Sequence, residues 1–132
     1  MLPAANAVEL HELSKLYGSF AALRKVTAEF RAGHSYVVLG PNGAGKSTLL
    51  RHLAGLTRPS FGRLTVLGSA EITAVRSRIG YLGHDSMLYD ELTALENLRY
   101  TARLYAEGSA SPAGRWTPEQ SLAMVGLDAG LN

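Results

Sequence analysis

Hydrophobic and polar residues alternate in the first part of the chain, and this pattern predicts strands. Residues 8–13 alternate between apolar and polar side chains, with apolar residues at positions 8, 10 and 13, as expected for a strand with one buried face. Residues 23–30 are compatible with a second strand, and residues 17–19, which include a glycine, predict a turn between the two. We therefore expect the chain to begin with a half-buried β-region.

A different pattern follows at residues 35–39, which are apolar and β-branched without alternation and so predict a strand buried on both faces. Residues 46–56 then predict a helix that ends at Gly55 and the Arg58-Pro59 pair. Further short strands are predicted at residues 62–68 and 79–82. The helix should bury one face made of four leucines: Leu49, Leu50, Leu53 and Leu56.

The period becomes helical from residue 93. Thr93 and Glu96 have the spacing of an N-terminal capping box, and the helix should end before Gly108. Its expected apolar stripe consists of Leu95, Leu98, Ala102 and Tyr105. Residues 109–115 predict a loop, and residues 117–126 predict a second helix with a threonine cap, proline at its first position and a terminating glycine. The chain is thus an α/β region followed by the beginning of a helical one.

Composition excludes several classes of protein. The 132 residues suffice for one domain, or part of one, and contain no cysteine, which rules out disulfides, thiolate metal sites and cysteine nucleophiles. A net charge of +2 is too small to indicate a nucleic-acid partner. The first residues do not resemble a secretion signal, and no apolar run is long enough to cross a membrane. We expect a soluble protein that reaches a membrane only by docking onto another subunit.

One motif carries chemistry, because residues 40–48 satisfy the P-loop pattern between a predicted buried strand and a helix. Glycines let successive backbone N–H groups point into one concavity, and the helix N-terminus adds its positive dipole end. Lys46 should reach the β- and γ-phosphates of ATP, Ser47 should ligate Mg²⁺, and Thr48 should add a phosphate contact. The predicted nucleotide-binding residues are Gly40, Pro41, Asn42, Gly43, Ala44, Gly45, Lys46, Ser47 and Thr48.

With these residues the chain resembles the ATP-binding-cassette (ABC) ATPase family over nearly its whole length. Tyr17 lies 23 positions before Gly40, where the family has an aromatic that stacks on adenine. Residues 49–62 are similar to the family's first helix and the turn after it. Residues 79–84 resemble the strand that enters the Q-loop, and residues 92–98 resemble the start of the helical subdomain. The resemblance implies an α/β P-loop NTPase fold of ABC type.

The resemblance also implies a division of the chain. Residues 1–91 would form the N-terminal β-subdomain and P-loop core, and residues 92–132 the beginning of the helical subdomain, with the C-terminal half of the domain absent. These 132 residues contain no Leu-Ser-Gly-Gly-Gln signature, no strand ending in Asp-Glu and no switch histidine. We therefore expect ATP hydrolysis from the complete protein and none from this chain alone.

His84 departs from the family pattern, which usually has glutamine there to contact the metal, the attacking water and the membrane subunits. Imidazole can also ligate a metal or form a hydrogen bond, so His84 is a candidate catalytic and metal-contacting residue. Gly83-His84 and residues 92–100 together resemble the ATP-binding subunit of haem exporters of cytochrome c maturation. A general exporter ATPase is the alternative for the subfamily. His52 and His11 are expected to be structural.

The resemblance implies two such subunits enclosing two ATP molecules, each subunit docked on membrane-spanning permease subunits at the cytoplasmic face of the membrane. A soluble ABC ATPase of translation or DNA repair, and a nonhydrolytic regulatory nucleotide-binding module, remain the alternative functions. Cargo, and import against export, cannot be predicted from a motor subunit.

Overall fold

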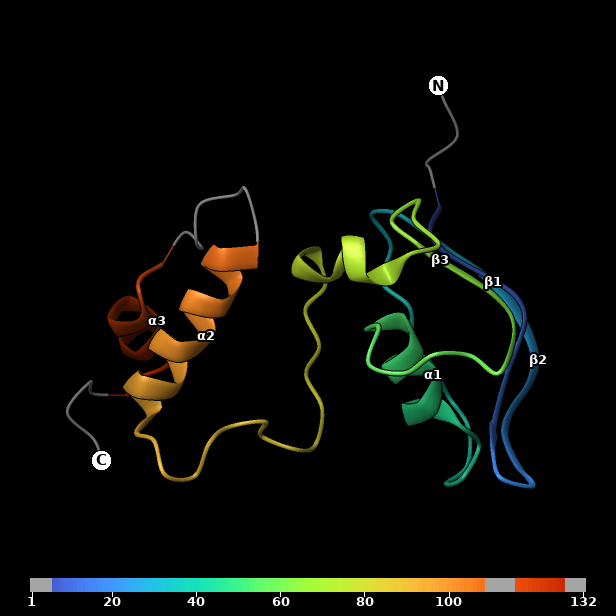
Figure 1. The fold of residues 1–132 in the computed structure, drawn as a ribbon, viewed down its shortest axis with the longest axis horizontal. Helices are drawn as coiled ribbons and strands as arrows, with labels where there is room; N and C mark the ends of the chain where they lie inside the picture. Colours follow the sequence, from blue (N-terminus) through green and yellow to red (C-terminus); the bar gives the residue numbers. More distant parts are fainter. Residues whose placement is uncertain (1–5, 109–115, 128–132) are drawn as a thin grey trace. The chain divides into compact units, whose positions relative to one another are not determined.

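The computed structural model describes residues 6–108 and 116–127, with backbone alone for residues 105–108. The chain divides into two compact units, Met1–Tyr81 and Leu82–Asn132, and each is described by itself. Their elements are labelled in Figure 1. The first unit contains β1 (Asn6–Tyr17), β2 (Phe20–Arg31), α1 (Lys46–Leu53), β3 (Phe61–Val66) and the short 3-10 helices η1 (Ile72–Ala74) and η2 (Arg76–Arg78), and the second contains α2 (Ala94–Gly108) and α3 (Pro118–Met124).

The first unit is built on a three-stranded antiparallel sheet in the order β2-β1-β3. The strands predicted at residues 8–13, 23–30 and 62–68 are confirmed, and the first two are longer than the pattern indicated. They share one core, in which Leu13 is completely buried. The other buried members of this core are Leu10, Leu23, Leu49, Leu64, Val66 and Val75.

Two opposed irregularities bend the β1–β2 ribbon. Glu12 and Lys25 both have left-handed backbones, with φ of 47° and 46°, and the pairing register shifts around them. Side-chain hydroxyls take the displaced backbone donors: the Glu12 N–H donates to Thr27 Oγ1 at 3.0 Å and the Lys25 N–H to Ser14 Oγ at 2.9 Å. The bend is therefore hydrogen-bonded on both strands.

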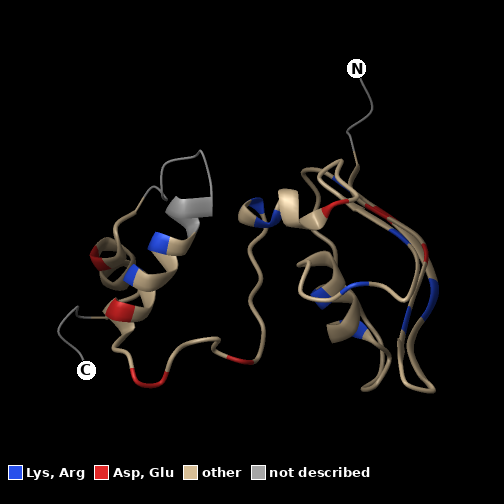
Figure 2. Ribbon diagram, in the orientation of Figure 1, with Lys and Arg blue, Asp and Glu red and all other residues tan. Residues whose placement is uncertain are grey.

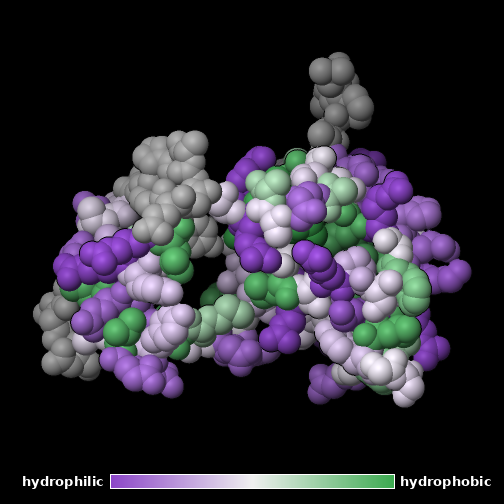
Figure 3. All heavy atoms as spheres, viewed as in Figure 1, coloured by the Kyte–Doolittle hydropathy of each residue, from purple (hydrophilic) through white to green (hydrophobic). Residues whose placement is uncertain are grey.

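Two predicted strands are absent. Residues 35–39 and 79–82 have no regular secondary structure, and neither segment pairs with another part of the described chain. Val38 packs against the core, whereas the side chains of Val37 and Leu39 are 80% and 86% exposed, so burial on both faces was a wrong prediction. An apolar run alone does not specify which strand will form hydrogen bonds with it. Figure 3 shows hydrophobic side chains reaching the surface.

Helix α1 ends three residues earlier than predicted. Gly55, with φ of 69°, and the next residue close it by two backbone hydrogen bonds, from the Gly55 N–H to the His52 carbonyl at 2.9 Å and from the Leu56 N–H to the Arg51 carbonyl at 2.9 Å. Leu56 consequently lies outside the helix. The predicted apolar face is partly wrong, because Leu49 and His52 are buried while Leu50 is 43% and Leu56 46% exposed.

The second unit has the two predicted helices, and both capping boxes are confirmed. The Glu96 N–H donates to Thr93 Oγ1 at 3.3 Å, and the Thr93 N–H donates back to Glu96 Oε2 at 2.9 Å. Hydrogen bonds from the Thr93 backbone and then its hydroxyl hold the pKa of Glu96 below its ordinary value. Helix α3 carries the same box between Thr117 and Gln120 and stops before Gly126, as predicted.

Helices α2 and α3 contact each other, and Arg99 of α2 forms an ion pair with Glu119 of α3 at 2.7 Å. The Glu119 pKa is lowered first by its own backbone N–H and then by Arg99. Buried Asn97 fastens the segment before α2, since its side chain forms hydrogen bonds with both the N–H and the carbonyl of Tyr89.

The predicted loop at residues 109–115 and the Tyr105 side chain lie outside the described part of the chain. None of the helices within residues 6–108 and 116–127 is long and apolar enough to span a membrane.

Candidate nucleotide-binding site

The P-loop residues form a tight turn that leads directly into α1. Gly43 and Gly45 have φ of 82° and 87°, values that glycine adopts without steric cost, and the Ala44 N–H donates to the Pro41 carbonyl at 3.2 Å. Gly45 is the residue that caps α1, and its carbonyl accepts the Leu49 N–H at 2.8 Å. The loop thus delivers its backbone N–H groups to the N-terminal end of a helix, where an anion is favoured.

The loop is seated against β2 through Gly45. A Cβ at this position would lie 2.4 Å from the Ala22 carbonyl oxygen and 2.9 Å from Leu23 Cδ2, so no larger residue fits without displacing the strand. Ala22 lies two residues after Phe20, which pairs with Tyr17 across the hairpin. The hairpin end and the P-loop therefore lie at the same end of the first unit, as Figure 1 shows.

The Lys46 side chain folds back over the loop. Its ammonium donates to the Gly40 and Pro41 carbonyls, both at 2.7 Å. Neutral carbonyls are weaker partners for an ammonium than the charged oxygens of a phosphate. Lys46, which is predicted to bind the β- and γ-phosphates, is thus held at the P-loop by two carbonyl oxygens that phosphate oxygens can replace.

Ser47 and Thr48 follow in the first turn of α1. The Ser47 hydroxyl is exposed and forms no hydrogen bond with any described residue, so it is available as an oxygen ligand of the kind Mg²⁺ prefers. Mg²⁺ commonly takes one or two protein ligands and completes its shell with phosphate oxygens and water, which suits a single hydroxyl here. The described residues contain no group of three or more histidine or acidic side chains that could hold a metal by themselves.

His52 supports this turn from the core side. The ring is completely buried, and its Nδ1 lies 2.7 Å from the Thr48 carbonyl, which can only accept, so Nδ1 carries the proton. Its Nε2 is buried and has no hydrogen-bond partner among the described atoms. The expectation that His52 is structural fits this buried position in α1.

Tyr17, the predicted adenine platform, is the last residue of β1, and its side chain is 51% exposed. The Lys15 ammonium lies 5.1 Å from the centre of the Tyr17 ring, within the range of a cation–π contact. Sequence analysis missed Lys15. The signal was present, because residues two apart on a strand point to the same face.

His84 is exposed and lies in an irregular part of the second unit, whereas the P-loop belongs to the first. The catalytic and metal-contacting roles of His84 stay predictions. The acidic residues Asp85, Asp90 and Glu91 are likewise exposed in that unit.

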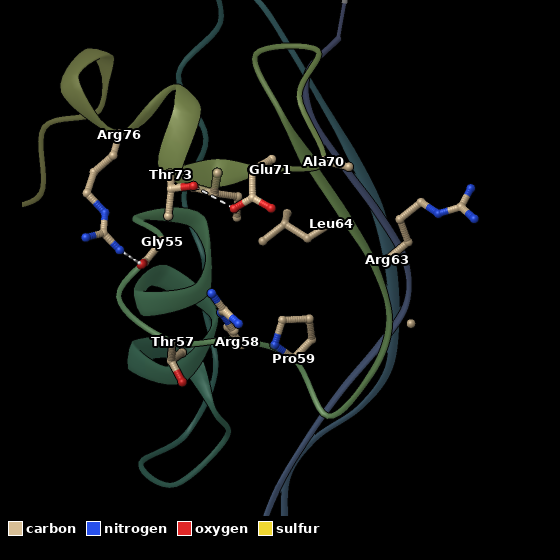
Figure 4. A pocket seen from close by; sticks show the side chains of 12 residues that line it. Gly55, Thr57, Arg58, Pro59, Arg63, Leu64, Ala70, Glu71, Thr73 and Arg76 are labelled. Carbon is tan, nitrogen blue, oxygen red and sulfur yellow. Dashed lines mark hydrogen bonds between the residues drawn. The ribbon is translucent and has the colours of Figure 1, made fainter. Parts of the chain in front are cut away.

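A cavity of about 420 Å³ lies beyond the C-terminal end of α1, and none of its lining residues belongs to the P-loop. Figure 4 shows Arg76 closing one side by donating to the Gly55 carbonyl at 2.6 Å, and Glu71 accepting a hydrogen bond from Thr73 at 2.6 Å. Figure 2 shows Lys and Arg residues along α1 and the strands of the same unit. The cavity therefore lies at the C-terminal end of α1, whereas the predicted phosphate site lies at the N-terminal end.

Residues 23–130 match the family model described as ABC transporter. The chain belongs to the ABC transporter family. Its match begins in β2 and includes the P-loop and both helices of the second unit. The predicted family, and with it the mixed α/β fold class of an ABC ATP-binding domain, are confirmed.

Individual curated relatives support the same family. The chain is 37% identical over 106 residues to the probable multidrug ABC transporter ATP-binding protein YbhF of Escherichia coli K12, covering 78% of this chain and 18% of that protein. It is 40% identical over 115 residues to the daunorubicin resistance ATP-binding protein DrrA3 of Streptomyces coeruleorubidus, covering 85% and 36% respectively. The chain thus spans well under half the length of these curated ABC relatives.

Among solved ABC structures, the ATP-binding cassette MJ0796 is similar with a TM-score of 0.65 and 29% identity, over 79% of this chain and 50% of that one. That structure is a dimer in a post-hydrolysis state bound to ADP and phosphate. The likeness supports the ABC fold of the present chain.

Proposed function

We propose that this chain is the nucleotide-binding part of an ABC transporter's ATP-binding subunit, in which Mg²⁺-ATP binds at the P-loop. The observation that supports it best is the loop itself. Two left-handed glycines shape it, Gly45 seats it on β2, and Lys46 stands over its mouth on replaceable carbonyl partners. Such a concavity of backbone N–H groups and one ammonium suits a polyphosphate.

In this proposal each residue has a separate task. Backbone N–H groups of residues 40 and 42–45 cradle the phosphates, Lys46 neutralises charge on the β- and γ-phosphates, and Ser47 ligates Mg²⁺. Thr48 adds a phosphate contact, and Tyr17 stacks on the adenine. His84 contacts the metal and the attacking water. Each task suits the chemistry of its side chain, and none requires a covalent intermediate.

The complete protein would work with two kinds of partner. A second nucleotide-binding subunit, by proposal a copy of the same protein, would face the bound ATP, and membrane-spanning permease subunits would be moved by closure and opening of the pair. The subunit would then lie at the cytoplasmic face of a membrane. The dimer of MJ0796 and the transporter names of the curated relatives support this arrangement.

The proposed direction of transport is export, since the relatives are named for multidrug transport and for daunorubicin resistance. Haem for cytochrome c maturation is the proposed cargo, and this part rests on the resemblance of Gly83, His84 and residues 92–100 to haem exporters. Deleting the gene should then abolish haem attachment to cytochrome c, and normal maturation in the deletion strain would remove haem from the proposal.

Phosphate release by the purified 132-residue chain is expected to be absent with Mg²⁺-ATP. A P-loop positions phosphates and metal, but the attacking water must be oriented by other groups, and a partner surface must cover the γ-phosphate. A coupled phosphate assay should give no more than the background of heat-treated chain. Sustained turnover by the chain would place the catalytic base within these residues and contradict the proposal.

The Tyr17→Ala substitution is expected to weaken ATP and GTP binding alike, by roughly tenfold to 100-fold, because stacking of a base on an aromatic ring is worth about 1–3 kcal/mol and tolerates different bases. Tyr17→Phe keeps the ring and should bind within about twofold of the unsubstituted chain. Isothermal titration calorimetry measures both. Unchanged affinity in Tyr17→Ala would return Tyr17 to a packing role.

A further inference from the structure

We propose that Lys15 is a positioning residue for the adenine platform: its ammonium holds the Tyr17 ring in the orientation that accepts the base. The inference rests on the proposed function, because it presumes that Tyr17 stacks on adenine. Lys15 itself is half-buried, although it lies at the exposed end of β1. Its ammonium lies 5.1 Å from the Tyr17 ring centre and donates a hydrogen bond of 2.8 Å to the Arg58 carbonyl.

The hydrogen bond to Arg58 matters because it fixes where the ammonium is. Lysine has a long flexible side chain, and a cation that moves freely in solvent orients nothing. Anchoring to a backbone carbonyl removes that freedom, so the cation presents a fixed electrostatic partner to the ring face. One face of Tyr17 is thus directed toward Lys15, while a side chain that is half exposed leaves surface for a second stacking partner.

The anchor belongs to a larger attachment between the end of β1 and residues 58–60. The Leu16 N–H donates to Ser60 Oγ at 3.0 Å, and the Ser60 N–H donates to the Ser14 carbonyl at 2.8 Å. Together with Lys15 these bonds join the platform strand to the loop that leaves α1. At the other end of α1, Gly45 contacts Ala22 of β2. The platform is therefore tied to both ends of the helix that begins at the P-loop.

This arrangement assigns Lys15 a contribution to base binding and none to phosphate binding. A Lys15→Met substitution keeps most of the apolar stem but removes the charge and the donor, so the Tyr17 ring is no longer held. We expect about threefold to tenfold weaker ATP binding, because losing an ordered cation–π contact lowers affinity by about this factor. Affinity for inorganic tripolyphosphate, which has no base, should stay within about twofold.

Two control variants accompany it. Lys15→Arg retains a cation and a donor and should bind ATP within about twofold of the unsubstituted chain. Lys25→Met removes an equal charge from the neighbouring strand, where the ammonium forms only an exposed pair with Glu12 at 3.4 Å, and should leave both ligands unaffected. Far-UV circular dichroism checks that each variant is folded. Weakening by Lys15→Arg as large as that by Lys15→Met would overturn the inference.

A double-mutant cycle with Tyr17→Ala separates the outcomes, with binding measured by isothermal titration calorimetry. If Lys15 acts through the ring, the Lys15→Met change should have no further effect on ATP affinity once Tyr17 is alanine. An equal loss in both backgrounds would mean that Lys15 acts directly on the nucleotide, and the inference fails. If Tyr17→Ala weakens binding but Lys15→Met does not, the positioning role alone fails. If Tyr17→Ala has no effect, the adenine platform of the proposed function fails as well.

Discussion

Replacing Lys46 with alanine is expected to weaken Mg²⁺-ATP binding by about 100-fold and to abolish hydrolysis in the full-length protein. Each hydrogen bond to a charged group is worth about 1.5–3 kcal/mol, and the Lys46 ammonium lies against the loop that is predicted to hold the phosphates. The fold should be unaffected, because the Gly40 and Pro41 carbonyls that Lys46 now bonds are exposed and can turn to water. Calorimetry with ATP and circular dichroism measure the two effects separately.

Lys25→Ala is the matched control for Lys46→Ala. It removes one ammonium from the same unit, and an exposed ion pair at 3.4 Å contributes little to stability or binding. ATP affinity should therefore stay within about twofold. Hydrolysis by a full-length Lys46→Ala protein at the unsubstituted rate would be incompatible with the P-loop assignment.

Gly45→Ala is expected to lower the free energy of unfolding by about 3 kcal/mol or more. An alanine at φ of 87° adopts a left-handed conformation at a cost of about 1–2 kcal/mol, and its Cβ would also meet the Ala22 carbonyl oxygen at 2.4 Å. The strand or the helix start must move to relieve that contact. Nucleotide binding should fall with it, since the displaced element carries the phosphate loop.

Gly43→Ala measures the conformational part of that effect without the steric part. Its backbone is similarly left-handed, at φ of 82°, but an added Cβ would meet nothing within 4 Å. The expected cost is the conformational one alone, about 1–2 kcal/mol. Urea unfolding followed by far-UV circular dichroism compares the two variants, and equal destabilisation would show that the Gly45 contact with β2 contributes nothing.

Structural features that depend on residues close together in the sequence were predictable. The alternation at residues 8–13 specifies a strand with one buried face, and the threonine and glutamate or glutamine of each capping box specify where α2 and α3 begin. The P-loop belongs to the same class, because its glycine positions and its lysine are fixed by spacing. In each case the interacting groups lie within a few residues of one another.

Features that depend on distant partners were not predictable. Residues 35–39 have the composition of a central strand, but a strand needs neighbours, and composition does not say which segment supplies them. Leu50 and Leu56 were assigned to the buried face of the helix, but α1 ends at Leu53, before Leu56, and its buried residues are Leu49 and His52. The anchor of Lys15 depends on a distant partner in the same way, since Arg58 lies 43 residues further along the chain.

The bend of the β1–β2 ribbon limits where the chain can gain or lose residues. Gly62 lies against the Glu12 backbone, where an added Cβ would be 2.4 Å from the Glu12 carbonyl oxygen, and the end of β1 is fastened to residues 58–60. One inserted residue between these two attachments would turn Lys15 and Tyr17 to the opposite face of the sheet. The number of residues from Glu12 to Tyr17 therefore constrains the position of the Tyr17 ring more strictly than the identity of most side chains between them. An epitope or a fluorescent tag should be placed ahead of β1, where it leaves this number unchanged.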